Sequence, residues 1–178
     1  FNEAAFRANR AAFATADVAE FAVAAWTLEN NAAATYRELL IELRVNRSSR
    51  VVRGCQVLVI EWLLLQNPRA HFGPYRQPLP GQKHPGLGLL KEVFGWLVSV
   101  AEILELDGVY YVPSSYHVAI QSRRRVHFLE PAHEALVSAL EELFAGLPLA
   151  EASAMVDSGK VVDRSSGRVL EWEGYPMV

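Results

Sequence analysis

The stretch Pro80-Gly81-Gln82-Lys83-His84-Pro85-Gly86-Leu87-Gly88 decides how this chain is interpreted, because it runs directly into an amphipathic segment. Over residues 89–106, apolar side chains recur every three or four positions, which predicts a helix with one buried face. A turn before a helix leaves backbone N–H groups without partners inside the helix. Such groups can receive an anion, so we expect a phosphate-bearing ligand at this turn.

The composition is that of a globular chain. Of its 178 residues, 51% are hydrophobic and 21% are charged, which excludes a disordered polymer. The net charge of −3 argues against a dedicated nucleic-acid binder, since that function needs a basic excess. The single cysteine, Cys55, can form no internal disulfide, which favours a reducing cytoplasm. The apolar runs 57–65 and 87–106 are too short or too charged to span a bilayer, so we expect a soluble, cytoplasmic protein.

The residues after the first predicted helix indicate an α/β half. A strand over 109–112 is stopped by Pro113, and Ser114 or Ser115 can cap a helix that runs through Arg125. An extended segment and two further helices are then expected, over 126–129, 132–145 and 149–156. Residues 160–163 and 168–172 alternate around a Ser-Ser-Gly turn, which predicts a C-terminal β-hairpin.

The residues before the turn predict a helical front. Aromatic side chains at roughly helical intervals predict a first helix over 2–29, and a second is expected over 32–44. Residues 48–66 are ambiguous between helix and strand, and their length favours a helix. Residues 67–88, rich in proline and glycine, are expected to form one ordered functional loop. We therefore expect a helix-rich α+β fold in a single domain over 1–178, with a helical hairpin, this loop and an α/β half over 89–178. Because the chain opens on Phe1 rather than Met, we also expect residues to precede it.

The loop and the segments after it resemble the C-terminal half of the GNAT-type N-acyltransferase family. Lys83-His84-Pro85-Gly86-Leu87-Gly88 fits the family's pattern of a basic residue, two spacers, Gly, one spacer and Gly before a long helix, and Ala119–Phe128 keeps its later spacing. In that family backbone amides hold the pyrophosphate of acyl-coenzyme A. The resemblance implies antiparallel strands upstream of the loop and a strand that opens for the pantetheine arm. It also implies that acyl-coenzyme A is bound by Gln82, Lys83, His84, Gly86, Leu87 and Gly88.

Catalysis needs further groups, because acyl transfer requires a base for the amine and an acid for the departing thiolate. Arg123 stands where many members of the family carry the tyrosine that protonates the thiolate. Tyr116 and His117, just past the strand, are our candidate catalytic residues. Five histidines show neither an i, i+4 pair nor a cysteine at ligand spacing, so we expect no metal site.

Two functions stay open on this evidence. The first is a GNAT-like protein that binds an acyl-coenzyme A, or a similar phosphate-bearing ligand, and either transfers the acyl group or only binds it. The second is a non-catalytic interaction or assembly subunit, which would use the apolar front over 1–66 to contact a protein partner or a second copy of the chain.

Overall fold

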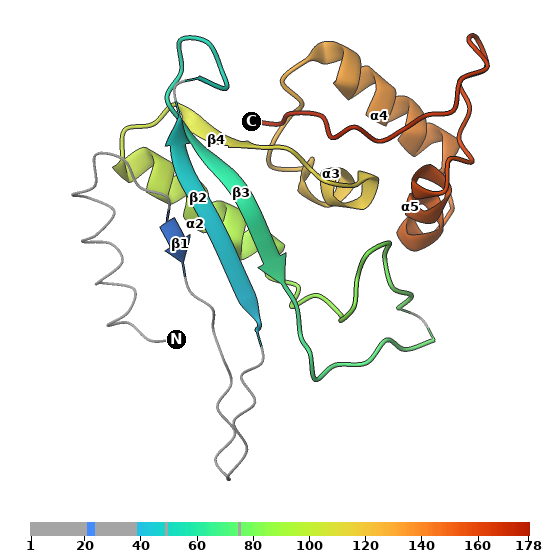
Figure 1. Cartoon of the computed structure of the whole chain (residues 1–178), viewed down its shortest axis with the longest axis horizontal. Coiled ribbons are helices and arrows are strands. Elements are labelled where there is room, and N and C mark those ends of the chain that lie inside the picture. The colour runs from blue at the N-terminus through green and yellow to red at the C-terminus, as the bar shows by residue number, and fades with distance from the viewer. Residues whose placement is uncertain (1–20, 24–38, 49, 75) are drawn as a thin grey trace. The chain divides into compact units, whose positions relative to one another are not determined.

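The computed structural model describes residues 21–23, 39–48, 50–74 and 76–178 (Figure 1). This part of the chain forms an α+β fold with four strands and four helices. Its contacts divide it into two compact units. The first unit contains the described residues up to Gln66 together with Leu87–Tyr110, and the second contains Asn67–Gly86 and Tyr111–Val178. No helix among the described residues is long and apolar enough to cross a membrane.

The first unit is built on a sheet with the strand order β1-β2-β3-β4. β1 (Phe21–Val23) pairs antiparallel with β2 (Ile41–Ser48), and β2 pairs antiparallel with β3 (Val57–Leu65). In β2, buried Leu43 and Val45 alternate with polar residues, as expected where successive side chains point to opposite faces of a sheet. The second face carries cross-strand contacts: the Trp62 indole N–H donates to the Glu42 carboxylate at 2.9 Å.

The predicted helical front is wrong wherever the structure describes it. The expected helix over 2–29 contains strand β1, the expected helix over 32–44 overlaps strand β2, and the 48–66 run contains strand β3. The remaining parts of the first two expected helices lie outside the described residues. The 48–66 run is divided at Gly54, which has a φ of +79° and follows Val52 in a turn closed by the Cys55 N–H. What remains apolar is a nine-residue segment, which is an ordinary strand length.

Helix α2 (Leu90–Ile103) confirms the helix expected over 89–106, with slightly narrower bounds. It contacts β3 and buries Phe94, Leu97 and Ala101. The chain leaves the helix through Glu105, whose left-handed φ of 54° lets the Leu106 N–H bond to the Ala101 carbonyl at 2.9 Å. The helix therefore ends three residues before the expected end at residue 106.

Strand β4 (Gly108–Tyr111) follows α2 and closes a β–α–β crossover. The Asp107 N–H donates to the Gln56 carbonyl at 2.8 Å, and the Gln56 N–H donates to the Asp107 carboxylate at 2.6 Å. These two bonds join the residue before β3 to the residue before β4. The crossover therefore returns the chain to the end of the sheet at which β3 begins.

The second unit consists of three helices and the C-terminal segment. The helices are α3 (Tyr116–Ser122), α4 (Pro131–Leu143) and α5 (Leu149–Asp157), and α3 contacts α5. Met177 is fully buried and exchanges two backbone hydrogen bonds with Tyr111, while Val178 exchanges two with His127. The C-terminal residues thus join two segments that are distant in sequence, as the trace ending at C in Figure 1 shows.

The expected C-terminal hairpin is present only as a turn with one antiparallel bridge. Val162 pairs with Val169, and the Leu170 N–H donates to the Val161 carbonyl at 2.8 Å. Hydrogen bonds from Ser166 and then Ser165 to the Asp163 carboxylate lower its pKa to about 2. Backbone hydrogen bonds from the Asp163 N–H to Arg168 and from the Gly167 N–H to Asp163 also close the turn, but with a single bridge the two arms form no strands in this described part of the chain.

Candidate functional site

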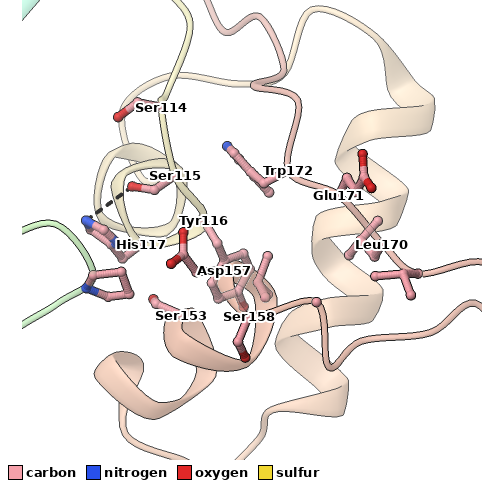
Figure 2. A pocket seen from close by; sticks show the side chains of 14 residues that line it. Ser114, Ser115, Tyr116, His117, Ser153, Asp157, Ser158, Leu170, Glu171 and Trp172 are labelled. Carbon is pink, nitrogen blue, oxygen red and sulfur yellow. Dashed lines mark hydrogen bonds between the residues drawn. The ribbon is translucent and has the colours of Figure 1, made fainter.

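The second unit contains a cavity of about 380 Å³ that is partly open to solvent. Its walls come from the start of α3, the C-terminal end of α5 and the segment 169–172 (Figure 2), and Pro80 of the loop also lines it. The polar and aromatic residues that line it are Ser114, Ser115, Tyr116, His117, Ser153, Asp157, Ser158, Glu171 and Trp172.

His117, a predicted catalytic residue, lines this cavity. It lies in the first turn of α3, is 6% exposed, and has its Nε2 atom 3.2 Å from the Ser115 hydroxyl oxygen. Burial lowers the pKa of His117 below its usual 6.5, and the nearby Asp157 carboxylate opposes that shift. The imidazole is therefore neutral at physiological pH. Its Nδ1 atom is buried and has no hydrogen-bond partner in the described part of the chain.

Ser153, on α5, presents a second unpaired polar atom. The residue is 2% exposed, and its hydroxyl oxygen has no partner among the described residues. Leaving a buried polar group without a hydrogen bond costs about 1–3 kcal/mol. Two such atoms in the wall of one cavity mark it as a place where a ligand or water gains hydrogen bonds.

Tyr116, the other predicted catalytic residue, has a packing role here. Its ring meets Phe144 and Trp172 edge to face, with ring centroids 5.7 and 5.9 Å away. Burial, followed by the charge of Glu141, raises the pKa of Tyr116 to about 12. The phenol is therefore a poor acid at neutral pH, and the side chain forms part of the wall.

The six residues predicted to bind the phosphate fall in two units. Gln82, Lys83, His84 and Gly86 belong to the second unit, while Leu87 and Gly88 belong to the first. Within the second unit the loop is braced by its own contacts. The Gln82 side-chain oxygen accepts from the Leu79 N–H at 3.2 Å, and the Gly86 carbonyl accepts from the Arg76 guanidinium at 3.1 Å.

The part of the motif in the first unit is an uncapped helix start. Gly88 is exposed with a φ of +74°, and Leu89 at the N-cap supplies no side-chain hydrogen bond. The N–H groups of the first turn of α2 therefore have neither an intrahelical nor a capping side-chain partner. Lys91 and Glu92 are both exposed in that turn, so its side-chain charges cancel.

Arg123 is held by carboxylates from α4. Its guanidinium donates to Glu134, with Nε 2.8 Å from Oε1, to Glu141, and to the Ser138 hydroxyl at 2.6 Å. These contacts tie the end of α3 to α4. The residue at the family's tyrosine position is thus engaged in bonds that hold the second unit together.

The comparisons with known proteins add nothing to this geometry, because no family model, curated protein or solved structure matches the chain. Metal binding has no support either: the residues that the structure describes contain no group of three or more His, Cys, Asp or Glu able to hold an ion.

The sequence did not reveal the other cavity residues. Ser115 entered only as a helix cap, and Ser153, Asp157 and Glu171 were not singled out. Ser153, Asp157 and Glu171 lie 36 to 56 positions after Ser115 and His117, so no motif spacing connects the two groups, and the packing of α3 against α5 helps to bring them together.

Proposed function

We propose that the protein binds an acyl-coenzyme A, or a similar phosphate-bearing ligand, at the start of α2. The observation that carries this proposal is the element order of the first unit. Antiparallel strands β1–β3 precede the glycine-containing turn, and helix α2 and strand β4 follow it. The resemblance to the GNAT-type family implies this order, including antiparallel strands upstream of the turn.

The start of α2 has the chemistry that such a ligand needs. Gly88 carries no side chain to block the approach of a phosphate, and the first-turn N–H groups point out of the helix. The helix dipole adds a partial positive charge at this end. Lys91 supplies a mobile cation in this turn, next to the Glu92 carboxylate.

The proposal is limited to binding. Arg123 takes the place of the family's tyrosine and is bound to two carboxylates and a hydroxyl, so the phenol that protonates the thiolate in that family is missing at this position. The alternative of an assembly subunit relied on a helical front. It loses that basis where residues 1–66 are described, since they form strands, and we do not propose it.

Titration calorimetry of the full chain with acetyl-coenzyme A and with coenzyme A tests the proposal. Gly88→Ala is the diagnostic variant, and Gly81→Ala is its matched control. Both glycines are exposed, have positive φ values of +74° and +78°, and have no atom within 4 Å of an added Cβ. Each substitution therefore costs about 1–2 kcal/mol of backbone strain.

We expect micromolar binding by the native chain and at least a fivefold loss in Gly88→Ala, because its methyl group would add bulk in the open space through which we propose that the phosphate approaches. Gly81→Ala should bind like the native chain. Absence of heat and of a thermal shift at millimolar coenzyme A would end the proposal. Equal losses in both variants would assign the effect to strain rather than to the ligand.

A further inference from the structure

We infer that the cavity of the second unit binds a small primary amine in its ammonium form, held by Asp157 and by the buried acceptors His117 and Ser153. This site is separate from the start of α2 and does not depend on the function proposed above. All of its residues belong to the second unit. The argument uses the unpaired atoms, the charge of the lining and the size of the cavity.

The two buried atoms without a partner in the described part of the chain, His117 Nδ1 and the Ser153 hydroxyl oxygen, favour a ligand that forms hydrogen bonds. His117 is 6% and Ser153 2% exposed, yet neither the Nδ1 atom nor the hydroxyl oxygen has a partner among the described residues. When the Nε2–H of His117 donates to Ser115, its Nδ1 is an acceptor and needs a donor from elsewhere. A ligand ammonium carries three N–H donors and no acceptor, so it can serve Nδ1, the serine oxygen and a carboxylate together.

The charge of the lining selects a cation. Asp157 and Glu171 are the carboxylates in the lining, and none of the described residues that line the cavity is a lysine or an arginine. The other titratable groups that face it are His117 and Tyr116, which are neutral at physiological pH. Figure 2 shows Asp157 within the lining; its carboxylate is exposed and lies near enough to His117 to act on the pKa of that imidazole. An anionic ligand would meet uncompensated negative charge here.

An organic cation fits better than a metal ion. One histidine and two carboxylates do not converge into a group that could hold a metal. The Trp172 indole N–H donates to the Pro113 carbonyl at 3.0 Å, and the residue lines the cavity. An aromatic face attracts an ammonium group. The volume of about 380 Å³ lies at the small end of ligand pockets. It suits a compact amine with a short apolar tail.

The experiment compares three probes of one shape. Phenethylamine, 2-phenylethanol and phenylacetate carry an ammonium, a hydroxyl and a carboxylate on the same phenyl tail. Each is titrated into the full-length chain, and the His117 ring signals are followed by NMR together with the thermal midpoint. We expect saturable His117 shifts with phenethylamine only. Equal shifts with 2-phenylethanol, or none with phenethylamine up to 10 mM (on the order of a −3 kcal/mol affinity), would overturn the inference.

Two variants assign the recognition to residues. Asp157→Asn keeps the shape of the side chain and removes its charge, and it should weaken phenethylamine binding about tenfold, as expected for loss of a charge-assisted hydrogen bond. Glu151→Gln is its control, because it removes the same charge from an exposed position in the first turn of α5, outside the cavity lining. Equal weakening in both variants would mean that net charge alone is sensed, which contradicts a site at Asp157.

Ser153→Ala separates a ligand role from a folding role. Because its hydroxyl has no protein partner among the described residues, the ligand-free variant should be as stable as the native chain or more so. Its phenethylamine binding should nevertheless fall about threefold to tenfold, since one acceptor is lost. A destabilised variant with unchanged binding would refute the role that we assign to this hydroxyl.

Discussion

Replacing Arg123 by leucine tests whether this residue is structural. The side chain is 18% exposed and bonds to Glu134, Glu141 and Ser138. Glu141 is 44% exposed, so its pair with Arg123 is screened by water and contributes at most about 0.5 kcal/mol. Glu134 accepts two hydrogen bonds from the guanidinium and is 35% exposed, so this pair contributes about 1–1.5 kcal/mol to the free energy of unfolding. With about 0.5–1 kcal/mol for Ser138, the expected loss of unfolding free energy is about 2–3 kcal/mol.

Urea unfolding of the single and double variants measures this loss and shows how much of it comes from each partner of Arg123. We expect a coupling energy of about 1 kcal/mol between Arg123→Leu and Glu134→Gln, and a smaller one between Arg123→Leu and Glu141→Gln. Burial acts to raise the pKa of Glu134, but the hydrogen bonds from Arg123 and from the Phe128 N–H, together with nearby charges, lower that pKa overall. The stability that this carboxylate contributes is therefore present above its unfolded pKa near 4.5 and is lost as the pH falls through its lower folded value.

The reasoning fails if Arg123→Leu is as stable as the native chain at pH 7, or if its coupling to Glu134 is zero. It also fails if the variant keeps full stability but loses binding of coenzyme A, because Arg123 would then act on the ligand rather than on α4.

Three further outcomes can be measured by chemical or thermal unfolding. Leu58→Ala should lower the free energy of unfolding by about 2–5 kcal/mol, because this strand residue is 1% exposed. Leu143→Ala, at a 64% exposed position, should change it by less than about 0.5 kcal/mol. Similar losses in the two variants would contradict the assignment of the core. Gly174→Ala should destabilise by at least about 1 kcal/mol more than Gly167→Ala, since both have positive φ but only at Gly174 would the new Cβ lie 2.9 Å from a valine side chain. Burial lowers the pKa of His117 below 6.5, so between the folded and the unfolded pKa the unfolded chain binds a proton that the folded chain does not bind. The free energy of unfolding should therefore fall as the pH drops below 6.5. His117→Gln should flatten this pH dependence, and an unchanged slope would show that another group causes it.

Local patterns in the sequence were sufficient where one periodicity dominated. The 3–4 spacing over 89–106 predicted helix α2, and Pro131 at a helix start predicted α4. In both cases the residues of the buried face come from consecutive turns of the same segment. The β4 prediction over 109–112 succeeded for a related reason, since β-branched and aromatic residues stand just before a proline.

The front half was mispredicted although its signals were present. Ile41, Leu43 and Val45 alternate with polar residues at the period of a strand, and Gly54 interrupts the run over 48–66. The length of that run favours a helix, but its glycine and its valine and isoleucine residues favour the strand that forms. The strands are held by pairing between β2 and β3, which a helical interpretation does not consider.

The helices of the second half, the glycine turn before α2 and the globular composition can be inferred from the sequence, because they depend on neighbouring residues. The cavity of the second unit and the role of Arg123 depend on the tertiary structure. His117, Ser153 and Glu171 come from three separate segments, and their meeting depends on how α3, α5 and the C-terminal residues pack. A buried atom becomes unpaired, and so available to a ligand, only when packing has removed it from water without giving it a partner.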